Sequence, residues 1–424
     1  MRRRLNIKDF GAKSGGKALC TRAIQKAIEE AGKWGGEVYI PKGIFLTGAL
    51  FLKSNMSLYL EEEAILTGTT QEEEYPVMPD RIAGIEMEWP VGILNIRNAE
   101  NVKIHGVGKI DGQGFYWWQK YWGKDKHGGM RQEYEQQGLR WAVDYDCRRV
   151  RNVVVFNSRN VVLEGFDCCC SGFWNIHICY SQAITVSGVR IYDNQGPSTD
   201  GIDIDSSSQV LVEDCIISCN DDNICVKAGR DADGLRVGRK SENIVIRNCR
   251  LLEGEGITLG SETSGGICGI SVRDCTFTGT RNGFRLKSAR NRGGIIENVT
   301  VQGLNMTDVA CVFSFEGNWN PTYSYGEIPV DYKDKIPEHW HILTKKVVRE
   351  EGIPRIKNIK IERVKAVLSE KYSGVSQAFF LQGLEEAPFE NLDFLQVEIW
   401  AHSFGNISCV KNLRLQQVKI NICL

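Results

Sequence analysis

The sequence predicts an all-β fold, a single-stranded right-handed parallel β-helix (a solenoid) with an N-terminal capping helix. Short segments with apolar residues at alternate positions recur along the chain, and the closer neighbours begin roughly 23 to 34 residues apart, as in solenoids. Cys215, Cys249 and Cys275 follow three of these segments at one offset, which is typical of a core ladder in stacked coils. Leucine-rich repeats share the period, but their leucine and asparagine frame is absent.

A helix is predicted near the N-terminus. From Thr21 to Ala31, apolar residues recur at helical spacing starting at Ile24, with Thr21 as the expected N-cap and Gly32 as the stop. Because a solenoid must cover the open end of its first coil, we expect this helix to cap it, within a region of about residues 1–45.

Alternating segments supply the predicted coils. Each has apolar residues at its second and fourth positions, the pattern of a strand with one buried face. They are Asn101–Gly106, Asn160–Gly165, Ala183–Gly188, Gln209–Asp214, Asn243–Asn248, Gly269–Asp274, Asn298–Gly303, Asn358–Arg363 and Asn412–Gln417. An aromatic-rich stretch at about 318–341 interrupts the rhythm, and we expect a loop there that walls a cleft or covers a solenoid edge.

Four further hexads echo one another: Asp200–Asp205, Asp222–Lys227, Glu255–Gly260 and Asn282–Lys287. If they stack as parallel strands, equivalent residues lie about 4.8 Å apart. The first residues of the first three hexads, Asp200, Asp222 and Glu255, then form a column where the strands begin. The outward face gathers Asp203, Asp205, Lys227, Arg285 and Lys287. Carboxylates crowded beside cations on one surface suggest a catalytic site.

A single domain is predicted over residues 1–424, since no linker or charge block divides the chain and a solenoid grows by adding coils. Catalytic coils are expected at about 95–310, followed by C-terminal coils that carry the aromatic-rich loop. The sequence does not indicate the oligomeric state.

The composition limits the partners. The net charge is −1, from 52 Lys and Arg against 53 Asp and Glu, so no general attraction to nucleic acid or to an anionic membrane is expected. Fifteen cysteines, including Cys168–Cys170, suggest reduced thiols, and no apolar signal segment follows Met1. We therefore expect a cytoplasmic protein, or a secreted one if a signal peptide was trimmed from it.

Five ordered motifs closely resemble the signatures of the polygalacturonase family, family 28 of the glycoside hydrolases. They are Gly112–Gly114, Ser198–Asp203, Asn220–Asp222, Gly254–Gly256 with Gly260–Glu262, and Arg285–Lys287. The likeness covers roughly residues 5–310, and five motifs in order are much more specific than one. The resemblance implies a right-handed parallel β-helix that hydrolyses α-linked galacturonic acid polymers with inversion.

The resemblance also implies roles for single residues. Asp221 matches the general acid, Asp200 and Asp222 match the pair that activates water, and Arg285 and Lys287 match the cations that hold the substrate's carboxylate. An inverting enzyme needs its acid and base about 6.5 to 9.5 Å apart, which neighbouring coils can supply. No metal or cofactor is required by this scheme. Without a secretion signal, imported pectic oligosaccharides and exo attack at a chain end are expected.

Two further residues are predicted to bind substrate, Asp203 on the outward face and Glu255 in the column. Glu255 replaces the histidine that the family carries between two glycines. An ionised glutamate only accepts hydrogen bonds and adds negative charge to the column, whereas a protonated one donates a bond. Altered specificity, a lower pH optimum and a weakened enzyme all remain open, as does a neutral Glu255.

Two other classes of function compete with the hydrolase. A polysaccharide lyase on the same fold typically uses calcium and a basic residue, but the acids here are not arranged as a calcium cage. A non-catalytic carbohydrate-binding solenoid would follow if Glu255 marks lost catalysis. His177 is interpreted as a structural histidine, and Asp205 as a residue that ends its strand in a turn.

Overall fold

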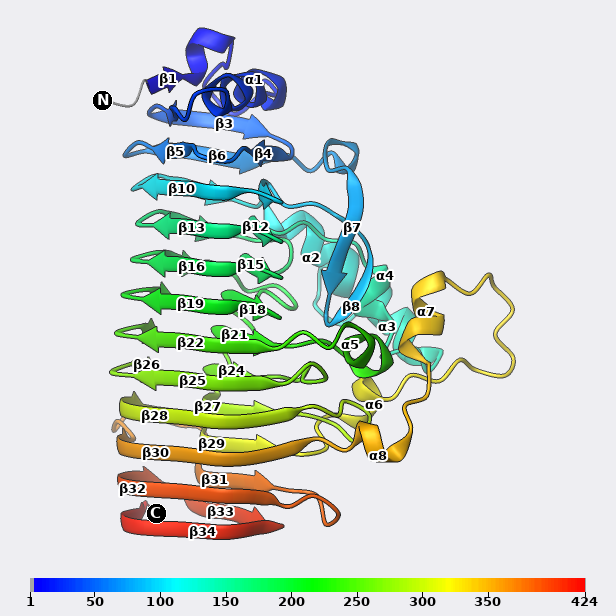
Figure 1. Ribbon diagram of the computed structural model, residues 1–424, viewed down its shortest axis with the longest axis vertical. Coiled ribbons are helices and arrows are strands. Elements are labelled where there is room, and N and C mark those ends of the chain that lie inside the picture. The colour runs from blue at the N-terminus through cyan, green and yellow to red at the C-terminus, as the bar shows by residue number, and fades with distance from the viewer. Residues whose placement is uncertain (1–3, 424) are drawn as a thin grey trace.

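The structure, a computed structural model that describes residues 4–423, is a right-handed parallel β-helix whose coils stack along one axis (Figure 1). Each central coil contributes a strand to an eleven-stranded sheet and one or two strands to a twenty-one-stranded sheet, both parallel. The fold class predicted from the sequence is confirmed.

The eleven-stranded sheet forms the face that carries the four hexads. Its strands are β4 (Leu50–Leu52), β9 (Leu94–Arg97), β12 (Val153–Phe156), β15 (Ile176–Cys179), β18 (Ile202–Asp205), β21 (Ile224–Lys227), β24 (Ile257–Leu259), β27 (Asn282–Lys287), β29 (Cys311–Glu316), β31 (Gln377–Gln382) and β33 (Ser403–Ser408).

The twenty-one-stranded sheet holds two ladders that merge in the long strand β28, which pairs with both β25 and β26. Its strands are β1 (Arg4–Asn6), β2 (Glu37–Ile40), β3 (Gly43–Thr47), β5 (Ser57–Leu60), β6 (Ala64–Gly68), β10 (Glu100–Gly106), β11 (Lys109–Asp111), β13 (Arg159–Glu164), β14 (Asp167–Cys169), β16 (Gln182–Ser187), β17 (Arg190–Tyr192), β19 (Ser208–Glu213), β20 (Ile216–Ile217), β22 (Ser241–Arg247), β23 (Arg250–Leu251), β25 (Ile267–Arg273), β26 (Thr276–Thr278), β28 (Ile295–Thr307), β30 (Arg355–Val367), β32 (Phe389–Ala401) and β34 (Val410–Ile422).

The predicted N-terminal helix is α1 (Thr21–Gly32), which lies over the first coil with its apolar stripe buried (Figure 1). The prediction for its ends was wrong, because Gly32 is still helical and Thr21 is not the N-cap. The cap position is Cys20, which makes no side-chain cap bond. Thr21 Oγ1 instead accepts a hydrogen bond from the Gly48 amide at 2.8 Å, so its hydroxyl ties the helix to the coil below.

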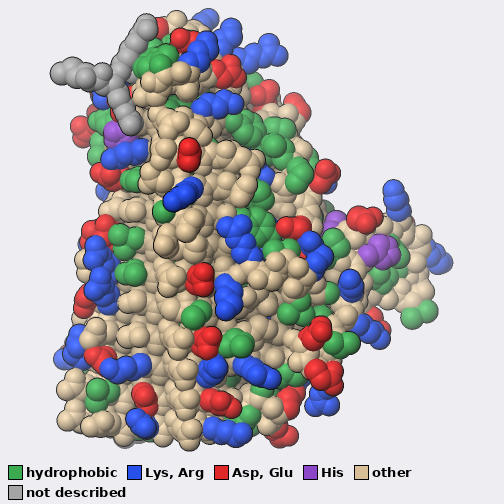
Figure 2. All heavy atoms as spheres, viewed as in Figure 1, with side chains coloured by type: hydrophobic (Ala, Val, Ile, Leu, Met, Phe, Trp, Pro, Cys, Tyr) green, Lys and Arg blue, Asp and Glu red, His purple; other side chains and the backbone are tan. Residues whose placement is uncertain are grey.

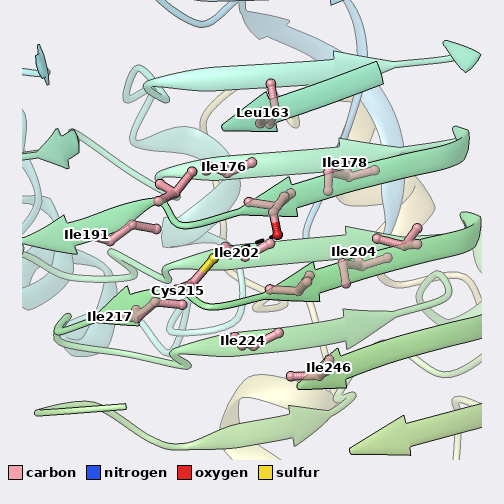
Figure 3. Packing of buried hydrophobic residues seen from close by; sticks show 14 of the residues in the cluster. Leu163, Ile176, Ile178, Ile191, Ile202, Ile204, Cys215, Ile217, Ile224 and Ile246 are labelled. Carbon is pink, nitrogen blue, oxygen red and sulfur yellow. Dashed lines mark hydrogen bonds between the residues drawn. The ribbon is translucent and has the colours of Figure 1, made fainter. Parts of the chain in front are cut away.

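Columns of identical or similar residues fill the space between the sheets. Ile176, Ile202 and Ile224 pair in register on three successive strands, and Figure 3 shows them stacked. Cys215, Cys249 and Cys275 are almost completely buried and precede residues that pair with one another, so the predicted cysteine ladder is confirmed. This repetition lets each coil bury the apolar face of the next.

A ladder of asparagines lies near the starts of strands in the twenty-one-stranded sheet. Asn101, Asn160, Asn243, Asn298, Asn358 and Asn412 all adopt left-handed backbone, with φ from 53° to 57°. Asparagine tolerates this conformation better than most residues. Its side-chain amides also bond along the stack, for example from Asn160 to Asn101 at 2.6 Å and from Asn412 to Asn391 at 3.0 Å. The recurring asparagine at the head of the sequence segments therefore has a conformational reason.

The insertions between coils gather on one side of the molecule, beside an antiparallel hairpin of β7 (Val77–Ile82) and β8 (Ile85–Pro90) (Figure 1). The helices there are α2 (Gly114–Trp122), α3 (Gly129–Gln136), α4 (Val143–Asp146), α5 (Asp231–Val237), α6 (Pro321–Ser324), α7 (Glu338–Leu343) and α8 (Arg349–Gly352). Two short 3-10 helices, η1 (Ile7–Phe10) and η2 (Glu72–Glu74), lie nearer the N-terminus. Trp89, Trp141 and Trp340 form a second apolar cluster that joins the hairpin to these helices.

The surface carries both signs of charge without a large field of either, as Figure 2 shows for one face. Among residues 4–423, no helix combines the length and the apolar character needed to cross a bilayer.

Candidate active site

The four hexads become the neighbouring strands β18, β21, β24 and β27, in the register that the sequence predicts. Ile202 pairs with Ile224, Ile224 with Ile257, and Ile257 with Phe284. Because equivalent hexad positions are neighbours, Asp200, Asp222 and Glu255 occupy one column at the strand starts.

A pocket of about 240 Å³ opens over these strands. Six predicted site residues line it: Asp200, Asp221, Asp222, Glu255, Arg285 and Lys287. Lys227 and Glu262 join them, together with Trp174, Trp319 and Tyr323. The stacking of the coils thus brings the predicted acids and cations to one concave surface.

Asp222 is held as a carboxylate at the base of this pocket. Lys287 Nζ donates to its Oδ2 at 2.8 Å, and Thr258 Oγ1 donates to its Oδ1 at 2.5 Å. Burial by itself raises the pKa of Asp222, but the charges of Lys287 and Lys227 outweigh it and hold that pKa well below the ordinary value. Asp222 is therefore ionised, and Lys287 is already engaged before any substrate binds.

Asp221, the adjacent residue, has a raised pKa and so retains its proton to higher pH than Asp222 does. Burial and the neighbouring Asp222 carboxylate raise the pKa of Asp221 to about 6. Its backbone is fixed from the next coil, where the Glu255 amide donates to the Asp221 carbonyl at 2.9 Å. Two consecutive aspartates whose pKa values are driven apart suit one acid and one base.

These two pKa values predict the pH dependence of turnover. An acid catalyst works only while protonated, so kcat should fall as pH rises through about 6, the pKa of Asp221. Because the pKa of Asp222 lies below the ordinary value for aspartate, the acid limb should lie below about pH 4. A pH–rate profile of kcat checks both limbs, and full activity maintained to pH 8 would contradict this assignment.

Lys227 is buried among three carboxylates. Its Nζ lies 3.7 Å from Asp200 Oδ2, 3.3 Å from Asp203 Oδ1 and 3.4 Å from Glu262 Oε2. Burial raises the pKa of Glu262, but Lys227 and Arg292 lower it to about 2. Burial and the nearby Asp203 and Asp221 raise the pKa of Asp200 well above its ordinary value. Lys227 thus neutralises this acidic group, a role the sequence did not reveal.

The carboxylates of Asp200 and Asp222 lie close to each other. One carboxylate oxygen of each lies within 4.8 Å of the other, which is short enough for a single water to bond both at about 2.8 Å. Of the two, only Asp222 is held ionised. The predicted water-activating pair is therefore unequal, because Asp222 is the member that is free to accept a proton.

The same two acids and Cys225 could together offer three ligand atoms to a metal ion, as could His177 with Cys179 and Asp205, and Asp111 with Cys169 and Cys170. In the first two groups, cations already contact the donor atoms. Lys287 bonds Asp222, and Arg151 Nη1 lies 2.7 Å from His177 Nδ1. Positive charge at these positions opposes cation binding.

Glu255 is enclosed by positive charge. It forms ion pairs with Arg281 and with Arg285 Nη1, the latter at 3.1 Å, and accepts a bond from Asn282 Nδ2 at 2.5 Å. The negative charge that an ionised Glu255 adds to the column is balanced by these two arginines. Arg281 was missed because it lies outside the hexads, and only the stacking of coils brings it to Glu255.

Asp203 and Asp205 lie beneath the site. Both are completely buried, and neither lines the pocket. Asp203 supports Lys227, so its predicted contact with substrate is not what the structure shows. Asp205 is the last residue of β18, as predicted, and its Oδ2 lies 3.5 Å from Arg81 Nε of the β7–β8 hairpin. The contact of the hairpin with Asp205 is one that the sequence pattern did not indicate.

The aromatic residues divide between pocket and core. Trp174 lies over Lys227 and Trp319 over Lys287, with 5.3 and 4.7 Å between the amine and the ring centre. Trp117 is buried in the main core, and Trp118 Nε1 donates to the Ser171 carbonyl. In the 318–341 stretch, Trp319 lines the pocket as one of the two expectations had it, whereas Trp340 packs in the apolar cluster of the insertions.

A wall made of three insertions lines one side of the pocket, with Ala83 from the hairpin, Asp144 from α4 and Tyr323 from α6. Arg230 is completely buried and joins them: Nη1 donates to Tyr145 Oη, and Nη2 to the Tyr323 carbonyl, both at 2.7 Å. Its amide bonds the Gly84 carbonyl of the hairpin at 2.8 Å. Because charged bonds buried in this way are costly to break, the wall is a fixed part of the site.

Comparison with known proteins agrees with this geometry. The sequence model of glycosyl hydrolases family 28 matches residues 36–326. The chain belongs to glycosyl hydrolases family 28. The family predicted from the five motifs is therefore confirmed, and the protein is a glycosidase. A model named rhamnogalacturonase A/epimerase, pectate lyase-like, matches the N-terminal residues 4–67.

Individual relatives extend the likeness over most of the chain. A probable polygalacturonase of Vitis vinifera is 30% identical over 374 residues, which cover 82% of this chain and 71% of that protein. An exo-poly-alpha-D-galacturonosidase of Dickeya chrysanthemi is 26% identical, over 78% of this chain and 60% of that one. The crystal structure of a hyperthermoactive exopolygalacturonase from Thermotoga maritima matches with a TM-score of 0.77 at 26% identity, covering 99% of this family 28 chain and 88% of that one.

Proposed function

We propose that this family 28 glycosidase hydrolyses α-linked galacturonides in pectic oligosaccharides, from a chain end and with inversion. The observation that carries the proposal is the division of labour in the pocket. Asp221 holds a proton up to about pH 6, while Asp222 beside it is an ionised base. The relatives named above, which act on or are named for polygalacturonate, support the choice of substrate.

Each residue then has one task. Asp221 donates its proton to the glycosidic oxygen of the leaving sugar. Water lying between Asp200 and Asp222 attacks the anomeric carbon from the opposite face, and Asp222 accepts its proton. Arg285 and Lys287 bind the carboxylate of the sugar. Their present partners, Glu255 and Asp222, keep these cations in place until substrate enters.

Exo action is supported by the wall that Arg230 holds together. The wall lines one side of the pocket with residues from the β7–β8 hairpin, α4 and α6, and the bonds of Arg230 hold these insertions together. A chain end fits this geometry better than the middle of a chain.

The proposal predicts the products. Oligogalacturonides should give new reducing ends and small products from the first minutes, with no absorbance from a double bond, and proton NMR should show inverted anomers. A mixture of products of all sizes would contradict exo action, and a rise in ultraviolet absorbance would indicate a lyase.

Methyl-esterified oligomers should react poorly, because a charged contact to a carboxylate contributes about 1.5 to 3 kcal/mol. Arg285→Gln should reduce the difference in rate between the free-acid and the methyl-esterified oligomers.

Binding of these oligomers without any turnover would instead support the carbohydrate-binding alternative.

For location, we infer a reducing compartment such as the cytoplasm, on the ground that fifteen cysteines, all within residues 4–423, are free thiols.

A further inference from the structure

Arg281 makes contacts that no sequence motif explains. Its Nε pairs with Glu255 Oε1, and its Nη2 donates to the backbone carbonyl of Asn220 at 2.5 Å. Its own amide donates to the Gly254 carbonyl at 2.8 Å. The guanidinium therefore spans two coils, with one edge on Glu255 and another on the residue immediately before Asp221.

Glu255 completes the arrangement from the other side. Its backbone amide donates to the Asp221 carbonyl at 2.9 Å. Two successive carbonyls, those of Asn220 and Asp221, are thus bonded by a pair of residues that also bind each other. A planar guanidinium suits this task because its donors have fixed directions.

We propose that Arg281 is a positioning residue that, together with Glu255, clamps the Asn220–Asp221 backbone and thereby fixes the carboxyl of the general acid. The inference rests on the proposed function, since it assigns a purpose to the geometry of Asp221. It also gives Glu255 a role in this chain, because the Glu255 carboxylate binds the guanidinium of Arg281 and holds it in place.

The clamp is electrostatic as well as geometric. The charged or titratable groups that face Asp221 are Asp200, Cys219, Asp222, Lys227, Glu255, Arg281 and Lys287. Those that face Glu255 are Asp221, Arg281, Arg285 and Glu316. Loss of the Arg281 charge leaves Glu255 less compensated, so the pKa of Asp221 should rise.

Three variants distinguish the effect of the Arg281 charge from the effect of its hydrogen-bond geometry, and both from the general effect of losing an ion pair. Arg281→Gln removes the charge, and Arg281→Lys keeps the charge but lacks the fork that bonds Glu255 and Asn220 together. Arg247→Gln is the matched control, because Arg247 pairs with Glu213 at 2.5 Å on the other sheet. The readouts are kcat, KM and the basic limb of the pH profile on trigalacturonic acid, with the thermal midpoint of each variant.

Arg281→Gln should lower kcat roughly 10- to 100-fold, since a small misplacement of a catalytic group has effects of this size. Its basic limb should move to higher pH. Arg281→Lys should lower kcat with the limb unmoved, and Arg247→Gln should behave as the parent protein. A double variant, Glu255→Gln with Arg281→Gln, should return the limb towards the parent position while kcat stays low.

Parent-like kcat and an unmoved limb in Arg281→Gln would overturn the proposal, as would a lowered thermal midpoint with an unmoved limb. A parent protein inactive on trigalacturonic acid would contradict the proposed function instead. In that case the clamp is tested by carbon-13 NMR titration of the Asp221 carboxyl, which needs no substrate. A higher pKa in Arg281→Gln than in the parent supports the clamp, and an equal pKa overturns it.

Discussion

Asp221→Asn should abolish most of the activity while leaving the fold intact. The amide keeps the shape of the side chain but cannot give up a proton to the leaving oxygen, so kcat should fall by about 10² to 10⁴. The loss should be smaller for a substrate with an activated leaving group, such as a nitrophenyl galacturonide, because that group departs with less help from an acid. Initial rates on both substrates measure the difference.

Asp214→Asn is the matched control. Asp214 lies in a turn with φ of 56°, a conformation that asparagine also tolerates, and it does not line the pocket. Its variant should keep parent activity. Near-parent turnover in Asp221→Asn, with unchanged circular dichroism, would remove Asp221 from the mechanism.

Lys227→Met should destabilise the whole protein. The ammonium lies within 3.7 Å of Asp200, Asp203 and Glu262, all of them buried. Removing one partner from a buried ionic group typically costs about 3 to 5 kcal/mol, because the remaining charges are left uncompensated. Urea unfolding followed by circular dichroism should show this loss. Lys103→Met, at an exposed pair with Glu164, should cost no more than about 1 kcal/mol.

The loss of stability in Lys227→Met should depend on pH in a defined direction. Burial already raises the pKa values of Asp200 and Asp203, and loss of Lys227 should raise them further in the folded state. The folded variant therefore binds more protons than the folded parent near neutral pH, and the loss of stability should shrink as pH falls from 7 towards 5. A variant equally destabilised at pH 5 and pH 7 would show that lost packing, and not uncompensated charge, is the cause.

Much of the site could be predicted because the fold repeats. Alternating apolar residues fix which side of each strand faces the core, and a slip of one residue would expose that whole face. The register of the four hexads follows from this constraint, so Asp222 and Glu255 could be placed in one column from the pattern alone. The resemblance to family 28 added the roles of Asp221 and Lys287, which periodicity does not supply.

The burial of Asp203 could not be predicted from the strand pattern. Its outward direction was correct, but it is buried with Lys227 of the next coil against it, and it does not line the pocket. A contact between side chains of different coils is decided by the tertiary structure, whereas a strand pattern reports only the two faces of its own sheet. The N-cap prediction for Thr21 failed for a similar reason, since its hydroxyl bonds the next coil.

The sequence by itself determined the coil architecture, the strand register and the column of acids, because each depends on short periodic patterns within one strand or its neighbour. Only the tertiary structure decided the charge state of that column. Lys227, Arg281 and Arg230 reach their partners across coils or insertions. The free energy of a charge depends on every charge and every solvent-excluding group within several ångströms. Those neighbours come together only when the chain has folded.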